Sequence, residues 1–280
     1  MVACDYHAQR GRSQAGRIPV GSLIAVDLFD LSGKTALVTG GNGGIGLGMA
    51  EGLASRGANL VVLGRNPEKS AAAALKIRDE YKVETLAVSA DVSVEADVAR
   101  AVDEALARFG AINILINNAG INIRKPADQM TLDEWHTVMN VNLTSAFMMS
   151  KAVYPSLKKA GGGKVINIGS MTSIFGAGFA PAYATSKGGI VQLTKSQALA
   201  WAVDNIQVNA ILPGWFDTDL TKKARQEIAG MHERVLSRIA AGRWGTPADI
   251  AGTAIWLASP ASNYVTGIAI AVDGGYTAML

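Results

Sequence analysis

The chain has 280 residues, of which 49% are hydrophobic and only 18% are charged, so a disordered polar chain is excluded and one large domain is favoured. The formal net charge is +3, and residues 1–17 account for +2 of it, because Arg10, Arg12 and Arg17 stand against Asp5. The rest of the chain is nearly neutral, so we expect no nucleic-acid partner.

Cysteine and histidine usage gives a second set of limits. The single cysteine, Cys4, cannot close a disulfide within the chain, and His7, His136 and His232 show no metal-ligand spacing. We therefore expect a protein of a reducing compartment, the cytoplasm, without a metal site.

The first 28 residues contain a short apolar run, Ile18 to Val26, which Pro19 and Gly21 interrupt and which no A-x-A cleavage pattern follows. This run is far shorter than the ~20 apolar residues of a membrane-spanning helix, and no later segment reaches that length uninterrupted. We expect no membrane span. We interpret residues 1–28 as a loosely ordered N-terminal extension or, alternatively, as an unused upstream start before a domain of residues 29–280.

From Leu31 onward, short β-branched runs alternate with longer segments of helical period, a pattern typical of βαβ units on a parallel sheet. Right-handed crossovers then place helices on both faces of one doubly wound, seven-stranded parallel sheet of the α/β class. The predicted strands are Thr35–Val38, Ala58–Leu63, Glu84–Val88, Ile112–Ile116, Lys164–Ile168, Gln207–Leu212 and Ile268–Val272. The predicted helices lie near residues 44–56, 67–81, 94–109, 131–159, 182–203 and 247–258.

A glycine-rich turn, Thr39 to Gly46, joins the first strand to the first helix. Glycine lets backbone amides approach a pyrophosphate closely, and the helix that follows supplies N–H donors and a partial positive charge. This context predicts nucleotide binding rather than a tight connection alone. The predicted cofactor contacts in the turn are Gly40, Asn42, Gly43, Gly44, Ile45 and Gly46.

The second strand ends in Gly64-Arg65-Asn66, without the carboxylate that would hydrogen-bond the adenosine ribose of NAD. An arginine at this place favours a 2′-phosphate, so NADP(H) is the expected cofactor, with NAD(H) as the alternative. The opposing interpretation is a solvated Arg65, because the glycine turn offers no second basic residue to share the phosphate. Asp91 either accepts from the adenine amino group or caps the next helix, and Asn66 and Val92 are assigned to the same site.

Three further motifs follow the later strands. Asn117-Asn118-Ala119-Gly120 closes the fourth strand, Ser170 follows the fifth, and Tyr183 opens the next helix four residues before Lys187. Positions i and i+4 share one face of a helix, so Tyr183 and Lys187 point into the same cleft.

The combination of these motifs, in this order, resembles the short-chain dehydrogenase/reductase family from Leu31 to the C-terminus. Asn142, and Pro213-Gly214 with Thr218 after the sixth strand, also match. The resemblance implies a single-domain Rossmann fold, hydride transfer between NAD(P) and an alcohol or carbonyl compound, and a homotetramer or a dimer.

The resemblance also implies roles for four catalytic residues, Asn142, Ser170, Tyr183 and Lys187. Tyr183 would be the general acid/base, and lowering the pKa of a phenol from ~10 to neutrality requires about 4 kcal/mol, which Lys187 would largely supply. Ser170 would hold the substrate oxygen, with Ser173 as its nearest competitor, and Asn142 would position a water that relays protons. The remaining expected cofactor contacts are Asn118, Ala119, Gly120, Tyr183, Lys187, Pro213, Gly214 and Thr218.

The loops after strands four to six should frame a small-molecule substrate, including a lid at about residues 215–243. Arg124 and Lys125 could bind a carboxylate, and the sequence around them resembles the sugar-acid dehydrogenases of the family. Apolar side chains around the expected cleft leave an apolar ketone or a cyclic alcohol open. They are Met171, Ile174, Phe175, Phe179, Trp215 and Phe216. A 3-oxoacyl thioester reductase and a non-catalytic nucleotide-sensing protein are also compatible with the motifs. The predicted substrate contacts are Arg124, Ser170, Tyr183 and Trp215.

Overall fold

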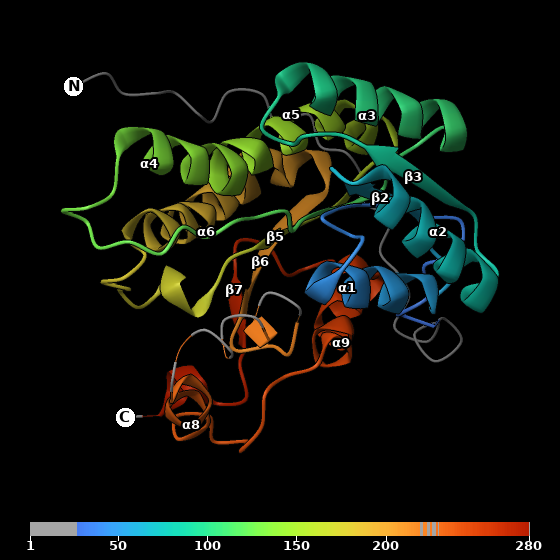
Figure 1. Ribbon diagram of the computed structural model, residues 1–280. Helices are drawn as coiled ribbons and strands as arrows, with labels where there is room; N and C mark the ends of the chain where they lie inside the picture. The colour runs from blue at the N-terminus through green and yellow to red at the C-terminus, as the bar shows by residue number, and fades with distance from the viewer. Residues whose placement is uncertain (1–26, 219–220, 223–224, 226–227, 229, 280) are drawn as a thin grey trace.

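The computed structural model describes residues 27–218, 221–222, 225, 228 and 230–279, so all but the last two residues of the predicted extension 1–28 lie outside the described residues. A seven-stranded sheet forms the centre, in the order β3-β2-β1-β4-β5-β6-β7, and every neighbouring pair is parallel (Figure 1). The α/β prediction is therefore confirmed. The strands are β1 Thr35–Thr39, β2 Asn59–Gly64, β3 Thr85–Ser89, β4 Ile114–Asn117, β5 Gly163–Ile168, β6 Ile206–Pro213 and β7 Ala269–Val272.

Helices cover both faces of the sheet. The described helices are α1 Gly44–Ala54, α2 Pro67–Tyr81, α3 Glu95–Phe109, α4 Leu132–Met139, α5 Ser145–Lys159, α6 Pro181–Trp201, α8 Met231–Leu236 and α9 Pro247–Ala258. One hydrophobic core packs α1, α2 and α9 on the sheet, and the other packs α3, α5 and the end of α6 on the opposite face. Because both faces are covered, β1, β4 and β6 are buried along their whole length and read as continuous apolar runs.

The helix predicted over residues 131–159 is wrong in one respect. A π-helical turn, Asn140–Thr144, separates α4 from α5. Such a turn widens the helix locally and is frequent at functional sites. It carries the buried side chain of Asn142.

Two features of the fold position the site. The strand order reverses between β1 and β4, and ligands of open α/β sheets bind beyond the carboxyl ends of the strands at such a point. A small separate hydrophobic cluster packs α8 against Ile239 and Trp244. No helix in the described part of the chain is long and apolar enough to cross a bilayer.

Candidate functional site

The glycine-rich turn has the backbone that a bound anion requires. Gly40 and Gly44 have φ angles of 63° and 55°, a region that favours glycine. A Cβ atom on Gly46 would lie 2.3 Å from the carbonyl oxygen of Gly40 and 2.4 Å from Nδ2 of Asn118, so a larger residue cannot occupy this position without a shift. No side chain caps α1, and its first N–H groups are therefore free to bind an anion.

A cavity of about 220 Å³ opens beside this turn, at the carboxyl ends of the first four strands. It brings together many of the predicted cofactor contacts. Its lining residues are Gly40, Asn42, Leu63, Gly64, Arg65, Ala90, Asp91, Val92, Ala119, Gly120, Ile121 and Val141.

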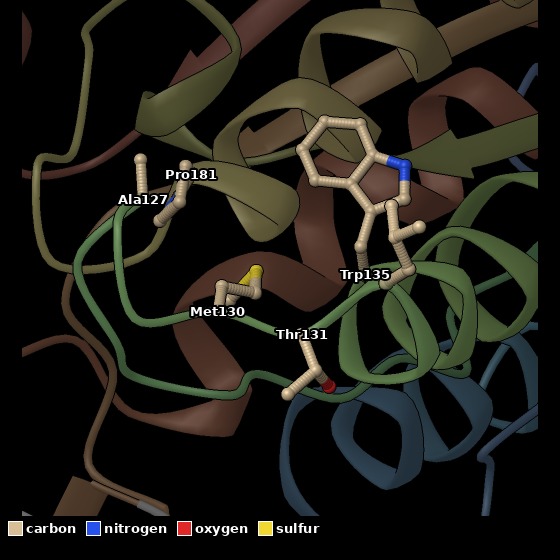
Figure 2. Close-up of a pocket in the computed structure, with 6 residues that line it drawn as sticks. Ala127, Met130, Thr131, Trp135 and Pro181 are labelled. Carbon is tan, nitrogen blue, oxygen red and sulfur yellow. The ribbon is translucent and has the colours of Figure 1, made fainter.

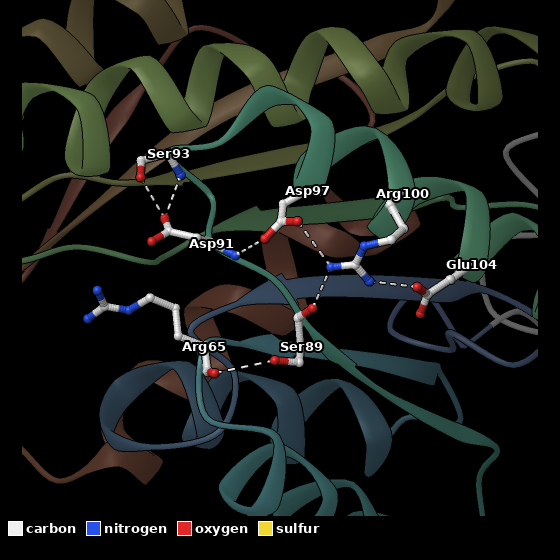
Figure 3. Close-up of polar contacts among 7 residues, drawn as sticks. All are labelled: Arg65, Ser89, Asp91, Ser93, Asp97, Arg100 and Glu104. Carbon is white, nitrogen blue, oxygen red and sulfur yellow. Dashed lines mark hydrogen bonds and ion pairs between the residues drawn. The ribbon is translucent and has the colours of Figure 1, made fainter.

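Arg65 and Asp91 lie at the adenosine end expected from the sequence. Asp91 accepts from the N–H and the hydroxyl of Ser93, and these bonds, together with the charge of Arg65, hold the pKa of Asp91 below its usual value. Figure 3 shows the Arg65 guanidinium directed away from the network around Asp97. No hydrogen bond or ion pair occupies that guanidinium within the described ranges. The helix-cap alternative for Asp91 is wrong, because the residue that precedes α3 as its N-cap is Val94.

Two asparagines predicted as cofactor contacts have side chains that hydrogen-bond to the protein. The Asn118 amide donates to the carbonyl oxygens of Thr39 and Gly40 at 2.9 and 3.2 Å, which fastens β4 to the glycine turn. The Asn66 side chain accepts from the N–H of Lys69 at 2.8 Å and caps α2. The two side chains therefore hold the segments that border the cavity, and their role as cofactor contacts stays a prediction.

Two of the four predicted catalytic residues meet at Gly120, and contacts from Lys187 to Tyr183 and from Tyr183 to Ser170 connect the other two. A Cβ atom on Gly120 would lie 3.3 Å from Oδ1 of Asn142 and 3.6 Å from Nζ of Lys187. Nζ of Lys187 lies 5.7 Å from the ring centroid of Tyr183, as expected for one helix face. The Ser170 hydroxyl hydrogen-bonds the side chain of Tyr183.

The two candidate serines are now distinguishable. The Ser173 hydroxyl donates to the carbonyl oxygen of Lys187 at 2.7 Å and accepts from the N–H of Ser170 at 3.1 Å. Ser170 instead accepts from the N–H of Thr172 at 3.1 Å and reaches Tyr183. Ser173 therefore holds the loop, and Ser170 is the serine that faces the tyrosine.

The electrostatics of the pair differ from the expectation. Burial raises the pKa of Tyr183, although the Ser170 hydrogen bond partly opposes this shift. Burial also lowers the pKa of Lys187 to about 8, and its ammonium donates to the carbonyl oxygen of Ile168 at 2.7 Å. In the protein alone the cost of desolvation dominates the pKa of Tyr183, so a lowering by Lys187 together with the oxidised nicotinamide stays a prediction for the cofactor-bound state.

Comparison with known proteins places this geometry in a family. A family model described as enoyl-(acyl carrier protein) reductase matches residues 40–277. The 2-dehydro-3-deoxy-D-gluconate 5-dehydrogenase of Bacillus subtilis (strain 168) is 43% identical over 250 residues, which cover 89% of this chain and 97% of the relative. A gluconate 5-dehydrogenase from Burkholderia cenocepacia J2315 has a TM-score of 0.86 and 42% identity, covering 91% of this chain and 100% of that one.

The chain belongs to the short-chain dehydrogenase/reductase family. Membership makes the protein an oxidoreductase of alcohol and carbonyl groups. The segment after β6 reaches the glycine turn, because Cγ2 of Thr218 lies 3.5 Å from the position a Cβ would take on Gly44. Pro213 ends β6, and the N–H of Gly214 donates to the carbonyl oxygen of Val272.

The two basic residues predicted near the substrate, Arg124 and Lys125, differ in whether the protein neutralises their charge. Lys125 is ion-paired with Glu134, whereas exposed Arg124 has no ion pair among the residues that the structure describes. A hollow of about 200 Å³ lies between the loop that follows Arg124 and the start of α6 (Figure 2). Its lining residues are Ala127, Met130, Thr131, Leu132, Trp135 and Pro181.

Several of the apolar side chains expected around the substrate serve as packing. Trp215 meets Trp244 edge to face with ring centroids 5.6 Å apart, and Phe216 and Met171 are buried. Other side chains of the loop after β5 are exposed, namely Ile174, Phe175 and Phe179.

Sequence reasoning missed Lys69. Its Nζ atom lies 2.8 Å from the position a Cβ would take on Gly43, directly at the glycine turn. The sequence does place a lysine in the first turn of the helix after the second strand. Whether its side chain points toward the glycine turn depends on how α2 packs, which the sequence does not give.

Proposed function

We propose that the protein is an NADP(H)-preferring dehydrogenase that interconverts a secondary hydroxyl group of a sugar acid and the corresponding ketone. The observation that carries this proposal is the convergence of Tyr183, Ser170 and Lys187 beside a cavity lined by Arg65. The relatives support it, since several are dehydrogenases of gluconate derivatives, and the Burkholderia enzyme is in complex with NADP and tartrate.

The cavity fits a dinucleotide. The uncapped start of α1 and the turn around Gly46 suit the pyrophosphate, and Arg65 with Asp91 suit the adenosine end. Thr218 and Lys187 would hold the nicotinamide half. The bound cofactor supplies or accepts the hydride.

The protein's own groups handle the proton. Because burial raises the pKa of Tyr183, its phenol is protonated at neutral pH and donates to the substrate oxygen in the reductive direction. Ser170 donates a second hydrogen bond to that oxygen, where negative charge develops. Lys187, whose pKa is about 8, exchanges protons readily near neutral pH and returns one toward the tyrosine side.

The chemistry is tested with purified protein, NADP⁺ and a panel of gluconate, 2-deoxygluconate, glucose and cyclic alcohols, followed by NADPH absorbance. Gluconate and glucose differ in the carboxylate, so turnover of the acid alone supports the proposal. Tyr183→Phe should lower kcat by about 10²–10⁴-fold. Unchanged activity in that variant contradicts the catalytic assignment and favours another proton donor.

Arg124 supports the acid as substrate, because its guanidinium is exposed and unpaired within the described ranges. A charged hydrogen bond contributes about 1.5–3 kcal/mol, so Arg124→Ala should raise KM for the acid by about tenfold or more with kcat little changed. Lys125→Ala is the matched control, since Glu134 already occupies that ammonium. Equal effects of the two variants contradict a specific role for Arg124.

An apolar or cyclic alcohol is the second candidate. The exposed side chains of Ile174, Phe175 and Phe179 favour it, because they lie in the loop that follows Ser170. Turnover of cyclic alcohols without turnover of gluconate would select this candidate.

For the assembly we propose a homotetramer or a dimer in the cytoplasm. β7 is an edge strand with exposed alanines, Tyr264 is exposed a few residues before it, and Leu199 and Val203 are exposed at and just after the end of α6. Apolar side chains of this kind typically mark a subunit contact. Light scattering after size exclusion tests the assembly, and a monomer at micromolar concentration contradicts it.

A further inference from the structure

The ammonium of Lys69 occupies the space that a side chain on Gly43 would fill. Nζ lies 2.8 Å and Cε 3.1 Å from the Cβ position of Gly43. The backbone of Gly43 has a φ of −178°, which any residue adopts. Conformation therefore does not require glycine here, whereas a side chain would displace the ammonium.

A hydrogen bond fixes the glycine turn beside the exposed residue Lys69. Nδ2 of Asn42 donates to Oγ of Ser70 at 2.9 Å, and these residues are the direct neighbours of Gly43 and Lys69. The bond passes over Gly64, where a Cβ would lie 2.3 Å from Nδ2 of Asn42. Ser70 is fully buried, so the glycine turn is fixed against the first turn of α2.

The charges around this contact are not balanced within the protein. The ammonium of Lys69 has no ion pair or hydrogen bond in the described part of the chain, and the same holds for the guanidinium of Arg65. By contrast, Lys76 on the same helix is paired with Glu51 at 2.6 Å. The nearby acids are Glu68, which is exposed in the first turn of α2, and Asp91, whose carboxylate binds Ser93.

One of the two cations lines the cavity, and the other lies beside the glycine turn that forms part of the cavity wall. Arg65 lines it, and Lys69 covers Gly43, whose neighbour Asn42 lines it as well. A phosphate monoester carries nearly two negative charges, which an arginine binds through a bidentate hydrogen-bonded pair and a lysine binds as a point charge. Two unpaired cations at one cavity edge match this ligand better than the single charge of Arg65.

We propose that Lys69, together with Arg65, binds the 2′-phosphate of NADP(H), and that Lys69 is therefore a determinant of cofactor specificity. This inference rests on the NADP(H) preference proposed above. The second basic residue that the glycine turn lacks in sequence is supplied by α2, and Gly43 leaves room for it.

The test compares ligands that differ only in the 2′-phosphate. Calorimetric titration of the full chain with adenosine 2′,5′-bisphosphate and 5′-AMP, and with NADPH and NADH, requires no turnover. In Lys69→Gln, the affinity for the two 2′-phosphorylated ligands should fall by about tenfold, with less than a twofold change for the other two. Lys69→Arg should keep most of the preference, and Lys76→Gln is the control for loss of charge on α2. Gly43→Ala should reduce the same preference while Lys69 is still present.

The outcomes separate this inference from the proposed function. An equal loss for NADPH and NADH in Lys69→Gln assigns the ammonium to the pyrophosphate and overturns the proposal. An unchanged preference in Lys69→Gln also overturns it, while the NADP(H) preference itself stands. A wild-type protein that binds NADH as tightly as NADPH overturns both.

Discussion

Asn142 allows a sharp test, because its side chain makes structural hydrogen bonds in addition to the catalytic role that the family resemblance implies. Its side chain is buried, and its amide group makes three hydrogen bonds: Oδ1 accepts from the N–H of Ile121 at 2.8 Å, and Nδ2 donates to the carbonyl oxygen of Ile121 at 2.9 Å and to Oγ of Ser186 at 3.0 Å. The resemblance implied a residue that positions a water. In the structure, the Asn142 side chain also connects the backbone of Ile121, which follows β4, to Ser186 in α6.

The expected cost of Asn142→Ala follows from these bonds. Each contributes about 1 kcal/mol, so their loss lowers the free energy of unfolding by about 3 kcal/mol, and more where a backbone group of Ile121 stays buried without a partner. For a domain of this size, 1 kcal/mol corresponds to a shift in Tm of about 2–4 °C, so Tm should fall by about 6–12 °C.

Thermal unfolding by circular dichroism at fixed protein concentration measures this shift. Ser186→Ala removes one of the three bonds together with the bond from the Ser186 hydroxyl to the carbonyl oxygen of Tyr183, so its effect should be about two thirds of that of Asn142→Ala. Asn140→Ala is the matched control, because Asn140 is exposed in the same π-helical turn and its side chain only accepts from Thr144 at 3.4 Å. If Asn142→Ala melts within about 2 °C of wild type but loses activity, the residue acts on the chemistry alone and the structural argument is wrong.

Two other predictions follow from close packing and from burial. Gly46→Ala should abolish measurable binding of NADPH and lower Tm, because its Cβ would lie 2.3 Å from a backbone oxygen. Gly252→Ala is the control, since its Cβ meets no atom within 4 Å, and it should be neutral or stabilising. Calorimetric titration with NADPH and thermal melting curves compare the two variants. Burial lowers the pKa of Lys164 to about 8, so between that value and the ~10.4 of an unfolded lysine the unfolded state binds more protons and the free energy of unfolding rises with pH. From pH 7.5 to 10, the Tm of the wild-type protein should therefore rise relative to the Tm of Lys164→Met. Parallel Tm profiles of the two proteins over this range would contradict a lowered pKa of Lys164.

The strands were predictable because their signal is local and strong. Both faces of β1 are buried, so every residue from Thr35 to Thr39 must tolerate an apolar environment, and such a run stands out from the polar helix surfaces. The start of α2 was also predictable, since Asn66 caps it and Pro67 opens it. The π-helical turn was not, because it is a change of one residue within a long helical segment, and apolar periodicity is assigned over windows of several turns.

The grouping of the site residues was predictable from topology. Gly120 and Ser170 follow β4 and β5, which are neighbours in the sheet, and α6 begins shortly after the second of them. Their motifs therefore meet at one edge without knowledge of any side-chain position. What the motifs could not give is the electrostatic balance: whether Lys187 lowers the pKa of Tyr183 depends on desolvation, which is a property of the packed cleft.

The polar residues around the cleft fall into two groups, those whose side chains hydrogen-bond to the protein and those whose charged groups do not. Asn118 and Asn142 have their hydrogen bonds completed by neighbouring backbone, so a sequence motif that contains them marks a wall of the site as much as a ligand contact. The cationic groups of Arg65, Lys69 and Arg124 instead make no ion pair or hydrogen bond among the described residues, in a protein whose body is nearly neutral, although Arg65 lies close enough to Asp91 to lower the pKa of that carboxyl. Folding gains little from keeping such groups unpaired at a cavity edge. Their arrangement is explained if the missing charges belong to ligands, a phosphate at one end of the cleft and a carboxylate at the other.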